Sequence, residues 1–355
     1  PCCPSISDVT VSAATQRGTG STVSIELVKQ SLQVAHRKGF YLQPLLERCS
    51  LPADILQQES GQRLPVARFA EFWRQLADFL QDEFCLMDHR AMRPGSFAFM
   101  CRIAARQPTV AEGIAAGLEF LSLVFDDMHA VLRREQNLAQ IVFLESEPQP
   151  KRAFAYFTFW MYVHGLTCWL ANQRIPILAI DSRCPPPELD QDYRVMFTHS
   201  LRYNCQQSRL LFVCDSLDSP IRRSEQELQR FIADSPDNIM VKYRDPHSLT
   251  SQVRHLLGSI PPAEWPDAPA TAQQLCMSVA TLRRRLSEEG QSFQAIKDSV
   301  RKARALQLLA SEHQTFVDIA SSLGFADVSS FYKAFRKWTG IQPGFYRSTV
   351  LNQNS

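Results

Sequence analysis

The last quarter of the chain combines hydrophobic residues at helical spacing with two polar breaks, and this pattern predicts two short helices joined by a tight turn. The apolar face of the first helix comprises Ile319, Ala320 and Leu323. Gly324 follows directly, and glycine readily adopts the left-handed conformation that ends many helices. Phe325 then supplies an apolar side chain that fills the turn.

The second helix of this pair is expected to start at Asp327, because a carboxylate there can accept hydrogen bonds from the free amides of the first turn. Its apolar stripe consists of Phe331, Phe335 and Trp338. The opposite face carries Ser329, Lys333 and Arg336. A helix with such a polar and basic face has the dimensions and chemistry to enter the major groove of DNA, so the pattern predicts a helix-turn-helix.

A weaker copy of this pattern lies upstream, and we refer to the two copies as the first reader and the second reader. In the first reader, Ala272 and Leu275 would pack inward, Cys276 and Met277 would form the turn, and Ser278 would cap the second helix. That helix buries Val279, Leu282 and Leu286 and leaves Ala280, Arg283, Arg284 and Arg285 on its outside and flanks. Apolar residues at helical intervals from Phe293 to Leu309 predict one long helix that joins the readers as a rigid spacer. Readers held in this way would meet successive grooves one helical turn, ~34 Å, apart.

The second reader matches the motif I-A-x-x-x-G-F-x-x-x-S-x-F-x-x-x-F-[RK]-x-x-x-G-x-x-P-x-x-[FY]-R. The matching positions are Ile319, Ala320, Gly324, Phe325, Ser329, Phe331, Phe335, Arg336, Gly340, Pro343, Tyr346 and Arg347. The run M-S-V-A-T-L-R-R-R-L-S-E-E-G from Met277 and the pattern R-x-x-x-A-x-x-L-L from Arg301 extend the similarity upstream. On these residues the segment resembles the DNA-binding domain of the AraC/XylS family of bacterial transcription regulators. Cys276 departs from the family pattern, which usually has Gly in the first turn.

The resemblance, together with position on the exposed helix faces, implies which residues contact DNA. Base edges would be read by Ala280, Arg283 and Arg284 in the first reader and by Val328, Ser330, Tyr332 and Lys333 in the second. Nearer to phosphate would lie Arg285, Arg301, Arg336 and Lys337. The competing interpretation is a packed helical bundle with a solvated basic face, which is enough to explain any one of these residues taken alone. Two turn motifs, a spacer and outward basic residues occur together, and this combination favours DNA binding.

Charge is distributed unevenly along the chain. Residues 251–355 contain 12 Lys+Arg and 8 Asp+Glu, a net charge of +4. The whole chain has 38 Lys+Arg and 36 Asp+Glu, so the other 250 residues hold 26 and 28, a net charge of −2. A modestly basic end on a near-neutral body is expected when one domain meets phosphate and another does not.

The residues before position 220 predict an α+β domain. Helical apolar spacing covers 27–56, 66–84 and 109–125, and the last of these opens with a capping Thr. A hairpin is expected from 130–134 and 138–144, followed by two strand-like runs at 200–205 and 209–214. The pattern C-P-P-P-x-x-x-x-x-Y-x-x-x-F from Cys184 to Phe197 and L-x-x-P at Leu217 to Pro220 resemble the arabinose-binding-type sensor domain in the branch of the family with ornithine-utilisation regulators.

We therefore predict a mostly α protein, with an N-terminal α+β sensor and a C-terminal all-α domain in which a long linker helix joins two helix-turn-helix motifs. The expected divisions are a disordered tail at 1–23, an effector-sensing and dimerisation domain at 24–220, a linker at 221–246 and the DNA-binding domain at 247–350. The start lacks the basic and apolar pattern of a signal peptide. Ten cysteines without a C-x-x-C pair favour reduced thiols in a cytoplasm.

Residues 153–171 are nineteen in number and lack a formally charged side chain, which is about the length of a membrane span. A membrane-tethered regulator is therefore the alternative hypothesis. Against it, Tyr156, Trp160 and Trp169 are spread along the segment, whereas a span gathers such residues at two interfaces. A strand-like run follows after only three residues, so a core helix is the favoured interpretation.

The sensor offers an aromatic wall with one cation, a common way to hold a small carboxylate. Candidate effector-binding residues are Trp73, Arg102, His129, Tyr156 and Trp160, with His164 beside them. The same spacing suits ordinary packing, and a histidine in an apolar helix is more often part of the core.

No metallopeptidase, nucleophile-elbow or P-loop motif occurs, and we predict no catalytic residue, no metal site and no cofactor. An alkyl-transfer repair enzyme fused to the same reader is a third hypothesis, suggested by Cys2-Cys3-Pro4, but the P-C-H-R acceptor of such enzymes is absent. The working hypothesis is an effector-controlled activator. Its expected partners are double-stranded promoter DNA, RNA polymerase, a small-molecule effector and a second copy of the chain.

Overall fold

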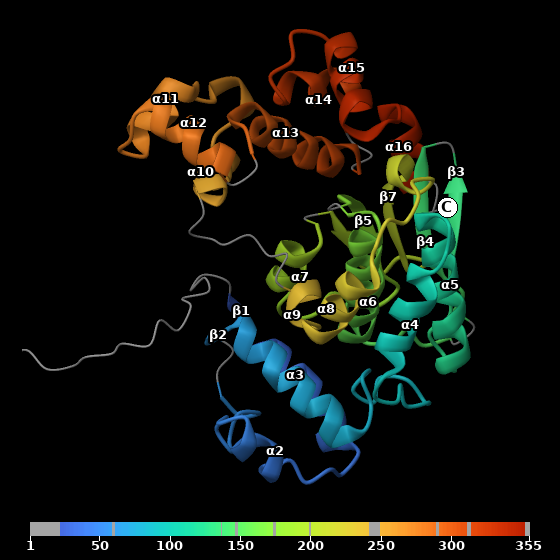
Figure 1. Cartoon of the computed structure of the whole chain (residues 1–355). Coiled ribbons are helices and arrows are strands. Elements are labelled where there is room, and N and C mark those ends of the chain that lie inside the picture. Colours follow the sequence, from blue (N-terminus) through green and yellow to red (C-terminus); the bar gives the residue numbers. More distant parts are fainter. Residues whose placement is uncertain are drawn as a thin grey trace, which may run out of the picture.

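The computed structural model shows a mixed α/β sensor followed by an all-helical domain (Figure 1). It describes residues 22–58, 61–135, 137–145, 148–172, 175–198, 200–240, 249–288, 291–310 and 314–351. Nearly all of the predicted tail, the Cys2-Cys3-Pro4 run and the predicted start of the DNA-binding domain at His247 lie outside these ranges. The predicted fold class is confirmed, with helices and one main sheet before the linker and helices alone after it.

The centre of the sensor is a five-stranded sheet in the order β3-β4-β7-β5-β6. The strands are β3 Ala130–Glu135, β4 Leu138–Phe143, β5 Ile177–Asp181, β6 Leu201–Arg202 and β7 Arg209–Val213. The predicted hairpin is confirmed, because β3 and β4 pair antiparallel from Ala130 opposite Phe143 to Glu135 opposite Leu138. The last pair, β5 and β6, is parallel.

Helix α6, Ala153–Leu170, lies against the inner face of the sheet. Every residue of this 18-residue helix except His164 is buried. The Phe143 ring of β4 lies 4.6 Å from that of Phe159 and 4.7 Å from that of Trp160. The core-helix interpretation is confirmed, and among the described residues no helix is both long and apolar enough to cross a membrane.

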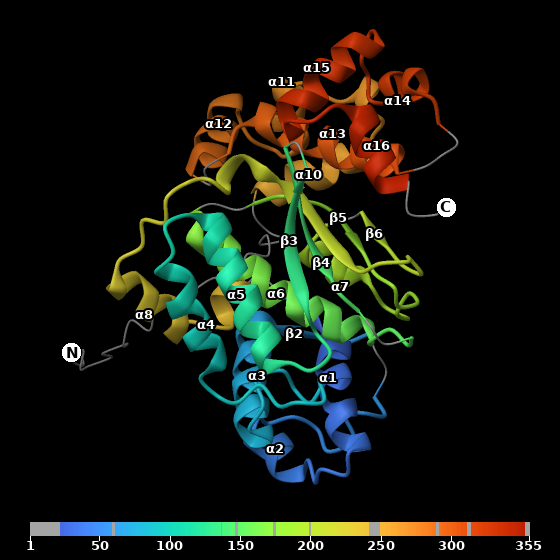
Figure 2. The ribbon, with the colours of Figure 1, turned by 90° about the vertical axis from the view of Figure 1, so that its right-hand side faces the viewer.

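Further helices enclose α6 and extend the sensor away from the sheet (Figure 2). They are α1 Ile25–Arg37, α2 Gln43–Arg48, α3 Val66–Leu80, α4 Ser96–Ala105, α5 Val110–Val124 and α7 Gln191–Met196, with a small ladder of β1 Thr22–Ser24 and β2 Arg63–Pro65 and a short 3-10 turn, η1, at Cys214–Ser216. The cap predicted for α5 is confirmed, since Thr109 and Glu112 form a reciprocal capping box. Helix α4 was not anticipated.

The predicted linker at 221–246 is wrong in its first part, because two helices there pack onto the sensor. These are α8 Glu225–Ala233 and α9 Asp237–Met240. Leu228, Phe231 and Ile239 belong to the sensor core, and the Phe231 ring stacks on Trp169 of α6 at 4.7 Å. Gly165 of α6 makes room for this packing, since a Cβ there would lie 2.6 Å from Ile239. The sensor therefore extends to Met240.

The C-terminal domain contains two small cores that share one long helix. Its elements are α10 Leu249–Ser259, η2 Pro262–Glu264, α11 Ala268–Gln274, α12 Val279–Glu288, α13 Phe293–Leu309, α14 Phe316–Ser322, α15 Val328–Thr339 and α16 Pro343–Leu351. Helix α13 contributes Ile296 and Val300 to the first core and Leu306 and Leu309 to the second. The predicted spacer helix is confirmed at both ends.

The second core continues onto the sensor. Leu138, Leu178, Ala179, Leu211 and Val213, from the outer face of the sheet, belong to the same hydrophobic cluster as the second reader. Both overall views place α16 beside this sheet (Figures 1 and 2). Strand side chains alternate between faces, so the sheet packs on α6 with one face and on the DNA-binding domain with the other.

Buried charges reinforce this contact between sensor and reader. Asp181 accepts hydrogen bonds from Arg202 Nε at 2.6 Å and from Arg209 Nε at 2.7 Å. The two arginines also donate to the carbonyls of Val350 and Thr349, at 2.7 and 2.8 Å, in the last turn of α16. Cations suit a helix C-terminus, because the carbonyls there lack partners within the helix.

Candidate DNA-binding surface and sensor cavity

The first reader forms as predicted, and its turn contains a non-glycine residue in the left-handed conformation. Asp267 caps α11 by accepting from the Ala270 amide at 2.9 Å. Cys276 has φ of +54°, so this cysteine adopts the conformation for which glycine is favoured. Ser278 then caps α12 by accepting from the Thr281 amide at 3.1 Å.

Helix α12 turns its apolar side inward and its basic side to solvent. Leu282 and Leu286 are buried at 0% and 1% exposure. Four predicted DNA-contacting residues are exposed: Ala280, Arg283, Arg284 and Arg285. The Arg284 guanidinium pairs with the Glu288 carboxylate at 2.6 Å, and both side chains are largely solvated. Such an exposed pair is weakly held, so Arg284 can exchange it for a base or a phosphate.

The second reader is held by two caps and a glycine turn. Thr315 and Asp318 form a capping box at the start of α14. Gly324 has φ of +73°, which confirms the predicted left-handed turn. Asp327 caps α15 by accepting from the Ser330 amide at 2.7 Å. Hydrogen bonds from the Ser330 amide and hydroxyl lower the pKa of the Asp327 carboxyl, which favours its charged form at this helix N-terminus.

Helix α15 buries Phe331 and Phe335 completely. Its exposed residues are Ser329, Lys333, Arg336 and Lys337. The other predicted base contacts are half-buried: Val328 and Tyr332 pack against the second core, and Ser330 uses its hydroxyl on Asp327. Lys333, Arg336 and Lys337 are therefore the second reader's cations that are freely presented to solvent.

Arg301 is placed differently from the other predicted phosphate contacts. It is half-buried on α13, where its guanidinium lies 4.9 Å from the Trp265 ring centroid and 5.6 Å from that of Phe325. Its Nε donates to the Leu323 carbonyl at 3.2 Å. Burial lowers the pKa of the Arg301 guanidinium from its usual value. A phosphate contact stays a prediction, but the same group already has a packing role.

The predicted effector residues lie in several parts of the sensor. Arg102 lies half-buried on α4, and His129 contacts the Asp126 carbonyl at 2.8 Å in the loop before β3. Tyr156 and Trp160 both pack against Phe143 on the sheet-facing side of α6. Burial, and then the hydrogen bond from its hydroxyl to Glu145, raise the pKa of Tyr156.

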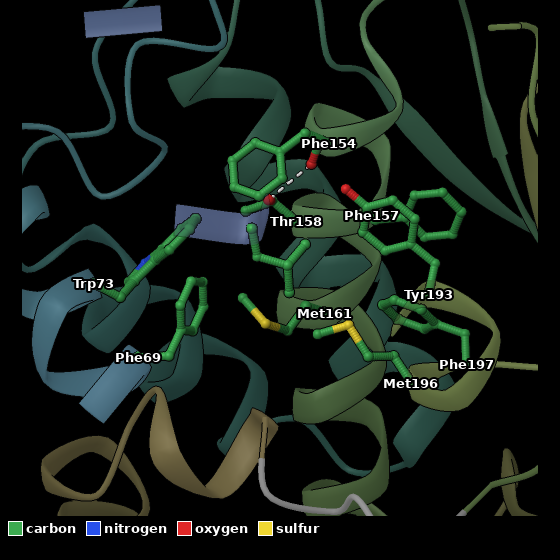
Figure 3. Close-up of a pocket in the computed structure, with 10 residues that line it drawn as sticks. Phe69, Trp73, Phe154, Phe157, Thr158, Met161, Tyr193, Met196 and Phe197 are labelled. Atoms are coloured by element: carbon green, nitrogen blue, oxygen red, sulfur yellow. Dashed lines mark hydrogen bonds between the residues drawn. The ribbon is translucent and has the colours of Figure 1, made fainter. Parts of the chain in front are cut away.

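Trp73 contributes instead to a small cavity on the other side of α6 (Figure 3). The cavity volume is about 20 Å³, and its lining consists of Leu27, Phe69, Trp73, Phe154, Phe157, Thr158, Met161, Tyr193, Met196 and Phe197. Its two hydroxyls are already engaged, since Thr158 donates to the Phe154 carbonyl at 2.8 Å and Tyr193 to Gln30 at 2.7 Å. No charged residue lines the wall, which suits an apolar group.

A sequence motif identified above contains two residues of this cavity. Tyr193 and Phe197 are the aromatic positions of the C-P-P-P-x-x-x-x-x-Y-x-x-x-F pattern, and the Tyr193 ring stacks on Phe157 at 3.9 Å. His164 instead contacts the Ile175 carbonyl at 2.8 Å. Within the described ranges, no group of three or more His, Cys, Asp or Glu side chains is placed to hold a metal.

Comparison with known proteins agrees with this architecture. Residues 39–221, more than half of the chain, match the model of the arabinose-binding domain of AraC transcription regulators, and residues 271–349 match a helix-turn-helix domain. These domains define a bacterial-type transcription regulator with a sensor and a DNA reader. The chain belongs to the AraC family of transcription regulators.

Individual relatives are more distant. The chain is 29% identical over 228 residues to the ornithine utilization regulator of Pseudomonas aeruginosa, covering 64% of each protein. It is 37% identical over 101 residues to the regulator VqsM of the same species, covering 28% of this chain and 31% of VqsM. Both matches therefore span less than two thirds of the relative. A crystal structure of the regulator CdpR from this species aligns over 91% of the chain and 98% of CdpR with 18% identity and a TM-score of 0.28.

Proposed function

We propose that this protein is a sequence-specific DNA-binding transcription regulator controlled by a small molecule. The observation that carries the proposal is the pair of helix-turn-helix units on one spacer helix, each with cations exposed on its second helix. Bases are read by side chains that reach the groove, whereas phosphate contacts supply affinity without sequence choice. Arg284 is assigned to bases and Lys337 to phosphate.

The test is a comparison of two substitutions on two kinds of DNA. Arg284→Ala should weaken binding to a duplex selected by the protein from a randomised library by ~1–3 kcal/mol and should leave binding to random duplex nearly unchanged. Lys337→Ala should weaken both equally and reduce the slope of log affinity against log salt by about one. Equal losses of Arg284→Ala on selected and random DNA would contradict the assignment, and failure to select any sequence would contradict sequence-specific binding.

We infer that the effector binds the sensor and inserts a small apolar group into the cavity beside α6, because a volume of about 20 Å³ admits a group of roughly the size of a methyl and not a whole metabolite. The wall offers aromatic and aliphatic side chains, and its hydroxyls already have partners. A compound at a hundred times its dissociation constant should stabilise the folded protein by ~2.7 kcal/mol. Thr158→Leu, whose larger side chain fills the cavity with less overpacking than an aromatic ring would cause at this buried position, should abolish that stabilisation. Unchanged stabilisation by the compound would place the effector elsewhere, for example near Arg102 and His129.

Three further parts of the proposal concern partners and location. The regulator acts in the cytoplasm, contacts RNA polymerase as an activator, and pairs with a second copy through the sensor. Pairing makes the second DNA contact intramolecular, so the whole chain with its sensor should bind two half-sites more tightly than one. Sedimentation of the protein on such DNA measures this directly, and a single copy on two half-sites would remove the pairing role.

A further inference from the structure

The two readers meet at a joint that neither motif predicts. On the first reader's side lie η2 and Trp265, and on the second reader's side lies the turn that contains Gly324. A Cβ on Gly324 would stand 3.2 Å from the Ala263 nitrogen and 3.3 Å from the Pro262 carbonyl carbon. The backbone of one reader is thus seated directly on the backbone of the other.

Arg301 projects from α13 into this joint and touches both sides. Its guanidinium lies 4.9 Å from the Trp265 ring centroid, on the first reader, and 5.6 Å from that of Phe325, on the second. Its Nε donates to the carbonyl of Leu323, the C-cap residue of α14. That bond satisfies a carbonyl left without a partner at the helix end. A planar cation between two rings is a contact that a lysine cannot reproduce.

Trp265 is itself held firmly on the first reader. Its Nε1 donates to the carbonyls of Leu257 at 2.8 Å and Ile260 at 3.0 Å, and the residue is 9% exposed. Arg304, one turn after Arg301 on α13, donates to the same Ile260 carbonyl at 3.0 Å. The ring that receives Arg301 therefore cannot move without disturbing the first core.

We propose that Arg301 and Trp265 are positioning residues for DNA recognition, which fix the mutual orientation of α12 and α15 and so set the spacing of the two DNA segments that the protein accepts. Helix α15 begins four residues after Gly324, so a shift of the turn moves the whole helix. This inference rests on the proposed DNA-binding function. It assigns to Arg301 a role distinct from the phosphate contact that the sequence predicts.

The experiment uses the full chain and a duplex that wild-type protein selects from a randomised library. Two derivatives are made: one has a base pair inserted between the segments read by α12 and α15, and the other has the α15 segment scrambled. Wild type should prefer the parent to the inserted duplex by about tenfold or more. In Arg301→Lys and Trp265→Phe this preference should fall to about twofold, while binding to the scrambled duplex and the salt slope stay unchanged.

The matched control is Arg304→Lys, on the same helix with the same change of side chain, which should keep the wild-type preference because a lysine there can still donate a hydrogen bond to the Ile260 carbonyl. A full preference retained in Arg301→Lys would overturn the proposal. A second result would also overturn it. If Arg301→Met lowered the slope of log affinity against log salt by about one and kept the preference for the parent over the inserted duplex, Arg301 would be a phosphate contact.

A measurement without DNA separates this inference from the proposed function. Hydrogen exchange of the DNA-free Arg301→Lys protein should speed up at 257–265 and 321–325, on the two sides of the joint, and stay unchanged in the sensor. Unchanged exchange at both sides would overturn the positioning role even if the protein bound DNA. If exchange changed as expected and no duplex were selected, the DNA-binding proposal would fail and the joint would stand as a structural element.

Discussion

Replacing Gly324 by alanine should separate the cost of backbone strain from the cost of crowding at the joint between readers. The residue has φ of +73°, where a Cβ meets the adjacent carbonyl, and this conformation costs a non-glycine residue ~1–2 kcal/mol. The lower chain entropy of alanine in the unfolded state returns ~0.4–1 kcal/mol. Strain alone is therefore expected to cost ~1 kcal/mol.

Crowding adds to this cost at Gly324. The added methyl would lie 3.2 to 3.3 Å from three backbone atoms of Pro262 and Ala263, and backbone cannot rotate away as a side chain does. Overpacking typically costs ~1–3 kcal/mol. The free energy of opening of α14 and α15 should therefore fall by ~2–4 kcal/mol in total, and valine should cost more because it is β-branched.

Native-state hydrogen exchange of the α14 and α15 amides measures this free energy in the full chain, and duplex binding should weaken in parallel. The matched control is Gly39→Ala, because Gly39 has φ of +82° and a Cβ there would meet nothing within 4 Å. Its cost, measured on α1 and α2, should stay near the strain value of ~1 kcal/mol. Equal costs at the two glycines would refute the crowding argument and with it the close seating of the readers.

Three other predictions follow from the described contacts. Cys276→Gly should stabilise α11 and α12 by up to ~1 kcal/mol, because φ of +54° is strained for cysteine, and hydrogen exchange of the first reader checks it. Arg209→Met should lower the melting temperature and expose α16 to exchange, because it removes one of the two arginines that pair with the buried Asp181 carboxylate and also removes the donor to the Thr349 carbonyl. Arg134→Met, at an exposed ion pair on the same sheet, should do neither. Hydrogen bonds from Ser224 and Arg223 lower the pKa of Glu227 to about 2. The stabilisation of α8 by the Glu227 carboxylate is therefore present above the unfolded pKa of 4.5 and is lost as the pH falls toward 2. Glu227→Gln should remove that part of the pH dependence, which an acid titration followed by hydrogen exchange of α8 measures.

Local signals made the readers and their spacer predictable from sequence. The cap at Asp327, the glycine turn and the stripe of Phe331 and Phe335 act within a few residues, so their physical chemistry does not depend on the rest of the fold. The same holds for the Thr109 cap of α5 and for the tight hairpin of β3 and β4.

The boundary of the sensor and the environment of Arg301 depend on packing partners that are far away in the sequence. Residues 221–240 were expected to link two domains. Instead, Phe231 packs on Trp169 and Ile239 packs against Gly165 of α6, and no local sequence pattern predicts these contacts. Arg301 has the spacing of a surface cation, and only the approach of Trp265 and Phe325 from two readers brings it into a joint.

The predicted effector residues show most clearly what sequence spacing cannot predict. Helix α6 is buried on all sides, so helical spacing carries no information about which face meets the cavity and which meets the sheet. Trp73 and Phe157 lie on the cavity side, whereas Tyr156 and Trp160 lie on the side of Phe143. The sequence by itself determined the helices and strands and the exposed basic faces of the readers, because capping, turn and amphipathic signals are local. Tertiary structure decided the cavity, the sensor boundary and the joint between readers, because each is made of contacts between segments that sequence spacing does not relate.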